Sequence, residues 1–196
     1  MPFAADKARA LSPQKKDRSR KGERDEQIEP LLALLNEHPD YYTTSSCAGR
    51  ILVMTEAGSK PESQWLFLSH VPVSAEQVRA ALSDLPADPV WVRMESFIVH
   101  VGCRTADAAE TIVTRARSLG LKRAGIIGLR PRVMVEVIGN ERLDAPIAER
   151  GLLVVSPEYL DVLIREGNRK LEANAERLSR FLDTLKAEFS AAAKSG

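Results

Sequence analysis

Phe97-Ile98-Val99-His100-Val101-Gly102-Cys103-Arg104 is a stretch of this 196-residue chain in which the residue type alternates with a period of two. Because successive side chains of a β-strand point to opposite faces, Phe97, Val99, Val101 and Cys103 share one face. The opposite face carries Ile98, His100, Gly102 and Arg104. The pattern predicts a strand whose apolar face, Cys103 included, packs on the core, while His100 and Arg104 share the more polar face.

The segments on either side predict further helices and strands. Upstream, strands are expected at 41–45, 50–55 and 64–70, with one helix inside 23–37 and another from the N-cap Ser74 to Leu85. Residues 90–104 are predicted as two strand segments broken near Glu95-Ser96. Downstream, Thr105 caps a helix, strands follow at 125–129, 132–138 and 152–155, and a long helix starts at Ser156.

This order of elements predicts an α+β fold, with a mixed, largely antiparallel sheet and a ferredoxin-like β-α-β-β-α-β core. The sheet would be packed by helices, including a long C-terminal helix with a stripe of large apolar residues: Leu160, Leu163, Leu171, Leu178, Leu185 and Phe189. In the first helix, Pro30 either causes a kink or starts the regular part. We expect a basic N-terminal arm over residues 1–22 and a single α+β catalytic domain over 23–196.

Composition narrows the class of protein. A hydrophobic fraction of 44% and a charged fraction of 28% are typical of a soluble globular protein. No apolar run is long enough to span a membrane, and residues 1–11 lack the apolar region of a secretory signal. The two cysteines, Cys47 and Cys103, define no disulfide framework, so a cytoplasmic location is expected.

The charge is unevenly distributed. Residues 1–22 carry seven Lys or Arg residues against two Asp residues, a net +5, so a chain total of +1 leaves −4 on the other 174 residues. A basic arm on a nearly neutral body suits contact with a polyanion, and a solvated tail is the alternative interpretation.

A second stretch, Thr43-Thr44-Ser45-Ser46-Cys47-Ala48-Gly49-Arg50, places four hydroxyls, a thiol, a glycine and an arginine between two predicted strands. Hydroxyls donate hydrogen bonds to anionic oxygens, a glycine lets a ligand approach the backbone, and a guanidinium matches a carboxylate or phosphate. An ordinary polar β-turn has the same residue types. On chemistry alone, an anion site and a turn both remain open.

Several sequence motifs of enzymes are absent. The chain has no G-x-G-x-x-G after a strand, no P-loop, no G-x-S-x-G, no H-E-x-x-H and no C-x-x-C, so neither a Rossmann-type cofactor site nor a metal site is predicted. Of the three histidines, His38 ends a helix before a proline and is interpreted as structural. His70 and His100 each lie near the C-terminal end of a strand, and either support the sheet or share a pocket with Arg104.

Taken together, several motifs resemble the tRNA wybutosine-synthesis methyltransferase family, whose yeast member is the third enzyme of the pathway and which has archaeal relatives. They are Asp17-Arg18-Ser19-Arg20-Lys21-Gly22, the stretch from Tyr42 to Ile51, Phe97 to Arg104, Gly120 to Ile126, and Glu158-Tyr159-Leu160 through Asn168 to Phe181. The resemblance covers residues 15–189 or so. The Ser-Ser-Cys-x-Gly-Arg motif, preceded by an aromatic residue and two threonines, is specific to this family when a His-x-x-Cys-Arg motif follows downstream.

The resemblance implies an S-adenosylmethionine-dependent tRNA N-methyltransferase. Its target would be N4 of the wyosine-type tricyclic base made from guanosine 37, in the anticodon loop of tRNA-Phe. It also implies site roles for named residues. The cofactor carboxylate or an RNA phosphate would be held by Ser45, Ser46, Gly49 and Arg50, with Arg104 in the same pocket. His100 would remove a proton, and His70 is the second candidate for this role. The residues on the tRNA side would be Asp17, Arg20, Lys21 and Cys47.

Two other functional classes give different expectations. A non-catalytic RNA-binding module would bind tRNA without affinity for S-adenosylmethionine. A small-molecule sensor would bind S-adenosylmethionine without salt-dependent RNA affinity.

Overall fold

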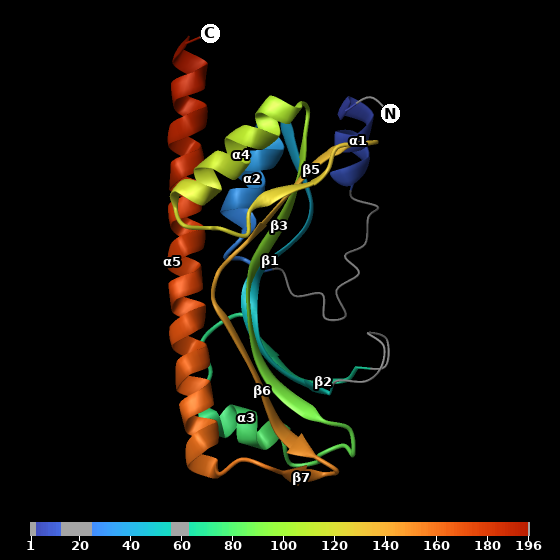
Figure 1. The fold of residues 1–196 in the computed structure, drawn as a ribbon, viewed down its shortest axis with the longest axis vertical. Helices are drawn as coiled ribbons and strands as arrows, with labels where there is room; N and C mark the ends of the chain where they lie inside the picture. Colours follow the sequence, from blue (N-terminus) through green and yellow to red (C-terminus); the bar gives the residue numbers. More distant parts are fainter. Residues whose placement is uncertain (1–2, 13–24, 56–62, 196) are drawn as a thin grey trace. The chain divides into compact units, whose positions relative to one another are not determined.

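The computed structural model describes residues 3–12, 25–55 and 63–195 of the chain (Figure 1). They form two compact units, which are described in turn. The first comprises Met1–Ala48, Phe97–Asn140 and Ala175–Gly196, and the second comprises Gly49–Ser96 and Glu141–Asn174. Three long elements contribute residues to both units: β1 (Tyr41–Thr55), β3 (Val90–Cys103) and α5 (Pro157–Ser195).

The prediction of an α+β fold with a long C-terminal helix is confirmed. The described strands form a seven-stranded sheet in the order β2-β1-β3-β5-β4, in which β6 pairs with β3 and β7 pairs with β6. The registered pairs of β1 with β2, of β3 with β5 and β6, of β4 with β5, and of β6 with β7 are antiparallel. No helix in the described part of the chain is long and apolar enough to cross a membrane.

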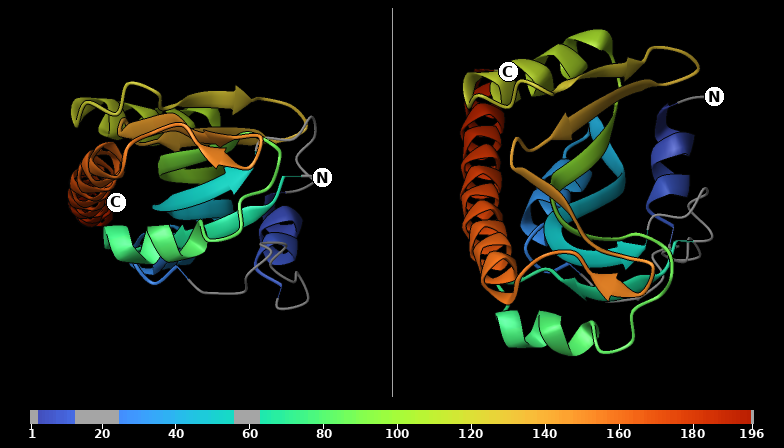
Figure 2. Two further views of the ribbon diagram at one scale, coloured as in Figure 1. Left: turned by 90° about the horizontal axis from the view of Figure 1, so that it is seen from below. Right: turned by 60° about the horizontal axis from the view of Figure 1, so that its bottom comes forward.

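In the first unit, α2 (Glu29–Glu37), α4 (Ala106–Ser118) and the C-terminal part of α5 pack on the sheet strands β3 and β5 (Val133–Ile138), and β4 (Gly125–Gly128) pairs with β5. Phe97, Val99 and Val101 are fully buried there and Cys103 is 3% exposed, as the alternation predicts. Each such burial stabilises the fold by roughly 1.5–3 kcal/mol for a large apolar side chain. The helix α1 (Phe3–Ala10), which lies in the segment predicted as an arm, is on the other side of the strands from α4, as Figure 1 and Figure 2 show.

In the second unit, α3 (Ala75–Ala81) and the first half of α5 pack against β2 (Trp65–Ser69), β6 (Arg142–Glu149) and parts of β1 and β3. The short strand β7 (Leu152–Leu153) extends β6. Ser74 caps α3 in a complete capping box with Gln77, as predicted. The apolar stripe of α5 is buried in each unit: Leu160, Leu163 and Leu171 in the second, and Leu178 and Leu185 in the first.

Two expectations of local structure are corrected, and one open alternative is resolved. The polar stretch before Gly49 is not a turn between two strands, because β1 runs unbroken through it with Thr44, Ser45 and Ser46 exposed. Hydroxyl side chains are compatible with a strand when its face is open to water. β3 is likewise one strand: it does not break at Glu95-Ser96, although it changes its partner from β6 to β5 there. Of the two alternatives for Pro30, the structure supports a position at the start of the helix: α2 begins at Glu29, and Pro30 lies in its first turn, where it does not kink the helix.

Candidate active site

A hydrogen-bonded chain of three side chains crosses the sheet of the first unit. His100 of β3 lies between Ser45 of β1 and Glu136 of β5. Its Nδ1 is 2.6 Å from the Ser45 hydroxyl oxygen, and its Nε2 is 2.8 Å from Oε2 of Glu136. Because His100 and Glu136 are directly opposite each other in the antiparallel register of β3 and β5, their side chains lie on the same face.

The partners of His100 determine its tautomer. A carboxylate only accepts hydrogen bonds, so Nε2 carries the proton that is donated to Glu136. In the neutral ring, Nδ1 is then the acceptor, and the Ser45 hydroxyl donates to it. The side chains of His100 and Glu136 are 23% and 28% exposed, and Ser45 is exposed. The imidazole is therefore held in one orientation with its basic nitrogen toward an accessible hydroxyl.

Beside this chain, an aromatic cluster fastens α1 to the sheet. Gly102, two residues from His100 on the same face, lies directly under the ring of Tyr42, which is 2% exposed. Phe3 of α1 packs on Tyr42 with ring centroids 5.4 Å apart. The guanidinium of Arg104 lies 4.7 Å from the centroid of the Phe3 ring and donates to the carboxylate of Asp40 at 2.5 Å. Arg104 is thus bound into this cluster.

Two further polar contacts hold α1 in place. The buried carboxylate of Asp6 forms ion pairs with Arg9 and, at 3.0 Å, with Arg132 just before β5. The Lys7 ammonium donates to the backbone carbonyl of His38 at 2.6 Å. A buried carboxylate needs such partners, because an unpaired charge in the interior is very costly. The helix α1 is therefore a built part of the first unit.

The two cysteines have different environments. Cys103 belongs to the core of the first unit, and burial raises the pKa of its thiol to about 12, so it is a thiol and not a thiolate at neutral pH. Cys47 is partly exposed on β1. Its neighbour Ala48 is buried and donates its backbone N–H to the carboxylate of Asp25, which lies before α2.

The second unit contains the other predicted site residues of the motif stretch. Gly49 has a φ of 104°, a left-handed conformation that favours glycine, and its carbonyl accepts a hydrogen bond from Nδ1 of His70 at 2.8 Å. The guanidinium of Arg50 forms an ion pair with Glu95 at 2.8 Å and lies 4.8 Å from the centroid of the Trp65 ring. Arg50 therefore already has a carboxylate partner within its own unit.

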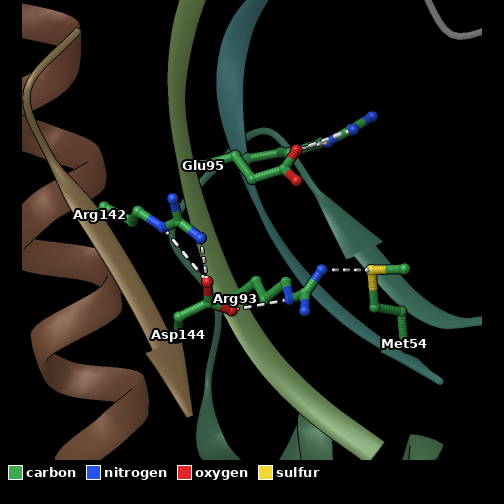
Figure 3. Close-up of polar contacts among 6 residues, drawn as sticks. Met54, Arg93, Glu95, Arg142 and Asp144 are labelled. Atoms are coloured by element: carbon green, nitrogen blue, oxygen red, sulfur yellow. Dashed lines mark hydrogen bonds and ion pairs between the residues drawn. The ribbon is translucent and has the colours of Figure 1, made fainter. Parts of the chain in front are cut away.

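A polar network surrounds this pair on β3 and β6 (Figure 3). The carboxylate of Asp144 binds Arg93 at 2.7 Å and also pairs with Arg142. Arg93 in turn approaches the sulfur of Met54 at 3.8 Å. Figure 3 shows Glu95 on the same strand as Arg93, and these alternate charged residues keep one face of the second unit polar.

The structure therefore assigns the predicted site residues to separate groups. Ser45, Ser46, Cys47, His100 and Arg104 lie in the first unit, whereas Gly49, Arg50 and His70 lie in the second. Asp17, Arg20 and Lys21 lie outside the described residues. The roles of all these residues in binding the cofactor or tRNA stay predictions.

Glu136 is the site residue that sequence reasoning missed. In the sequence it only interrupts an alternating run of valines, Val133, Val135 and Val137, which predicts that it faces away from the core. Its partnership with His100 depends on the register between β3 and β5, which no local pattern specifies.

Comparisons with known proteins identify relatives of this chain. A family model described as Methyltransferase TYW3 matches residues 5–187. A mouse protein named tRNA wybutosine-synthesizing protein 3 homolog is 39% identical over 189 residues, which cover 93% of this chain and 72% of the mouse protein. A Pyrococcus abyssi protein named tRNA(Phe) 7-((3-amino-3-carboxypropyl)-4-demethylwyosine(37)-N(4))-methyltransferase 1 is 37% identical over 165 residues, 83% of this chain and 85% of that protein.

The fold of this chain is also similar to that of solved structures. The PH1069 protein from Pyrococcus horikoshii superposes with a TM-score of 0.79 at 35% identity, and the match covers 86% of each chain. A hypothetical protein from Aeropyrum pernix superposes with a TM-score of 0.69 at 25% identity, covering 80% of this chain and 93% of the other.

Proposed function

The chain belongs to the TYW3 methyltransferase family, a family of transferases that act on tRNA, and we propose that it methylates N4 of the wyosine-type tricyclic base at position 37 of tRNA-Phe. The methyl donor in this proposal is S-adenosylmethionine. Support for the target comes from the Pyrococcus abyssi relative, whose name specifies N4 of a demethylwyosine at position 37 of tRNA(Phe).

The observation that carries the proposal is the chain of Ser45, His100 and Glu136. A ring nitrogen that bears a hydrogen must lose this proton when it forms a bond to a methyl carbon. An imidazole with a pKa of about 6.5 in model peptides suits the acceptance of a proton near neutral pH. The hydrogen bond to Glu136 holds that imidazole in the tautomer whose Nδ1 is the acceptor.

The residues of this face fit the proposed methyl donor by their chemistry. When bound, S-adenosylmethionine supplies an electrophilic methyl group on a cationic sulfur. The hydroxyl of Ser46, which is exposed next to Ser45 on β1, can donate a hydrogen bond to a carboxylate. The carboxylate of Glu136, 28% exposed, gives the same unit a negative group that favours a nearby cation.

In the proposed mechanism, the proton follows the hydrogen bonds of Ser45 and His100. The nitrogen of the base would form its new bond to the methyl carbon as the bond from that carbon to the donor sulfur breaks, so that the donor leaves as a neutral thioether. The N–H bond of the base nitrogen breaks in the same reaction. Because the Ser45 hydroxyl already donates to Nδ1 of His100, Ser45 accepts the proton from the base as its own proton passes to Nδ1. The resulting imidazolium donates from both nitrogens, and the carboxylate of Glu136 stabilises its charge. In this step Ser45 and His100 act together as the proton acceptor.

A single titration series tests the proposal. The isolated protein is titrated calorimetrically with S-adenosylmethionine, with and without tRNA-Phe that carries the demethylated base, and the tRNA is then analysed by mass spectrometry. We expect binding in both cases and a gain of one methyl group on the base at position 37. Binding of tRNA alone would indicate an RNA-binding module, and binding of S-adenosylmethionine without methyl transfer or RNA affinity would indicate a sensor; either result contradicts the proposal.

A further inference from the structure

The edge strand β4 exposes large aliphatic side chains. Ile126 is 42% exposed, Ile127 is 57% exposed, and Leu129, directly after the strand, is 62% exposed. Among the described strands, β4 pairs with β5 alone and so forms one end of the sheet path. Proteins usually protect an edge strand, because its unpaired backbone and apolar side chains invite association. This edge therefore has the properties of a surface that another molecule covers.

The charge around β4 has one sign. Residues 120–134 include Lys122, Arg123, Arg130 and Arg132 and contain no Asp or Glu. Arg132 pairs with Asp6. Lys122, Arg123 and Arg130 are exposed, and their side chains form no hydrogen bond or ion pair with residues 3–12, 25–55 or 63–195. Such a surface is complementary to a polyanion and would repel a second copy of itself.

The cations stand at the two ends of the strand. Lys122 and Arg123 lie in the turn between α4 and β4, and Arg130 lies in the turn between β4 and β5. Four strand residues at about 3.3 Å each separate these turns by about 13 Å. A stacked nucleic acid strand presents a phosphate about every 3.4 Å, so this span matches several phosphates of one strand.

The strand lies next to the proposed proton acceptor. Gly125 is directly opposite Glu136 in the register of β4 and β5, and Glu136 is directly opposite His100. Residues that face each other across antiparallel strands share a face, so Gly125 continues the row of His100 and Glu136 to the sheet edge. A Cβ added at Gly125 would meet no atom within 4 Å. The row therefore ends in open space at the edge of the sheet.

We propose that this surface, the β4 edge (Lys122, Arg123, Gly125, Ile127, Leu129 and Arg130), binds the single-stranded part of the tRNA that flanks the methylated base. The inference rests on the proposed function and names where its substrate docks. The cations bind phosphates, and the exposed aliphatic side chains pack against the faces of unstacked bases. Gly125 leaves room for the target base to reach the row of Glu136 and His100.

The first experiment measures the salt dependence of tRNA-Phe binding. Loss of two phosphate contacts in Arg123→Ala/Arg130→Ala should reduce the slope of log K against log salt by roughly 1.4, since each single-strand phosphate contributes about 0.7. The matched control is Arg180→Ala/Lys186→Ala on the exposed face of α5, which should leave the slope unchanged. S-adenosylmethionine affinity should be the same in wild type and both variants.

The second experiment fills the open space in steps. Gly125→Ala, Gly125→Val and Gly125→Leu should melt at or above the wild-type temperature, because a Cβ at this position meets no atom within 4 Å. The kcat/KM for tRNA-Phe should fall progressively, by roughly 10-fold or more for leucine, because the larger side chain occupies the room that the target base needs. The KM for S-adenosylmethionine should not change.

The outcomes separate this inference from the proposed function. If the wild type methylates tRNA-Phe while the Arg123/Arg130 slope and the Gly125 series stay at wild-type values, the β4 edge is not the docking surface and the proposed function stands. A change of slope in the α5 control in place of the β4 variant also overturns the inference. If Ile127→Glu turns a dimer into a monomer in sedimentation without affecting tRNA binding, the edge is a contact between copies. A wild type that neither binds nor methylates tRNA-Phe overturns the proposed function, and this inference with it.

Discussion

Gly102→Ala perturbs a close packing contact beside the candidate site, that of Gly102 with the Tyr42 ring. The new Cβ would lie under 3.0 Å from three atoms of the Tyr42 ring, a separation that real Cβ atoms essentially never show. The ring cannot move into water, because Tyr42 is 2% exposed and packs against Phe3 of α1. Either β1 or α1 must shift to accommodate one methyl group.

The size of the effect follows from two opposing contributions. Overpacking of a well-packed interior costs about 1–3 kcal/mol. Replacement of glycine by alanine in a strand regains about 0.5–1 kcal/mol, because the unfolded chain loses conformational freedom. At the middle of both ranges the net loss is about 1.3 kcal/mol, which corresponds to a decrease of about 3–5 °C in Tm for a chain of this length.

Thermal unfolding followed by circular dichroism measures this decrease. Gly125→Ala is the matched control, since it makes the same substitution on a strand of the same sheet where a Cβ meets nothing within 4 Å, and its Tm should not fall. In the background of Tyr42→Ala, which itself removes a buried ring, Gly102→Ala should have no further cost. A Gly102→Ala variant that melts at or above wild type, or that costs as much without the ring as with it, would refute the steric argument.

Three further predictions concern chemistry and pH. His100→Ala should lower kcat by roughly 10²-fold with little change in KM or Tm, as expected for loss of a general base; normal turnover of this variant in steady-state assays would assign the proton to another acceptor. Glu136→Gln should lower kcat less than His100→Ala. A thiol reagent at pH 8 should modify Cys47 and spare Cys103, because burial raises the pKa of the Cys103 thiol to about 12; equal modification of both thiols, as counted by mass spectrometry, would contradict the burial. Cys47→Ser should retain methyl transfer, because transfer to nitrogen needs no covalent enzyme intermediate. Burial lowers the pKa of His38, and Lys7 lowers it further against the opposing carboxylate of Asp40, so the unfolded state binds the proton more readily. The contribution of His38 to stability is therefore present above its unfolded pKa of about 6.5 and is lost as the pH falls through the lowered value; chemical denaturation at pH 7.5 and 5 should show a smaller acid-induced loss for His38→Gln, and an identical loss would refute the assignment.

Features that depend on neighbours in the sequence were predictable. The burial of Cys103 follows from its position in a two-residue alternation, and the caps at Ser74 and Thr105 each depend on a residue three positions away. These are local interactions, which an isolated segment already specifies. The α+β class follows in the same way from the order of such segments.

Features that depend on strand register were not predictable. The alternation places His100 on the polar face but does not select Ser45 and Glu136 as its neighbours, because a register shift of two residues on β5 would place Met134 or Ile138 opposite His100 with the same faces buried. The sequence contains Ser45 and His100 as candidates for one pocket, and only the pairing of β3 with β5 adds the carboxylate that orients the ring.

The polar residues that were expected to interrupt β3 show why a strand can continue through charges. Glu95 does not break the strand, because it pairs with Arg50 of β1 within the second unit, at 2.8 Å. Backbone hydrogen bonds continue on both sides of this point, to β6 through residues 90–95 and to β5 through residues 98–103. A strand ends where its backbone groups lose their partners, and a charged side chain with a partner of its own does not remove them. The same reasoning applies to β1, where the exposed hydroxyls of Thr44, Ser45 and Ser46 leave the backbone free to pair, so that the polar stretch presents Ser45 to His100 from a strand and not from a turn.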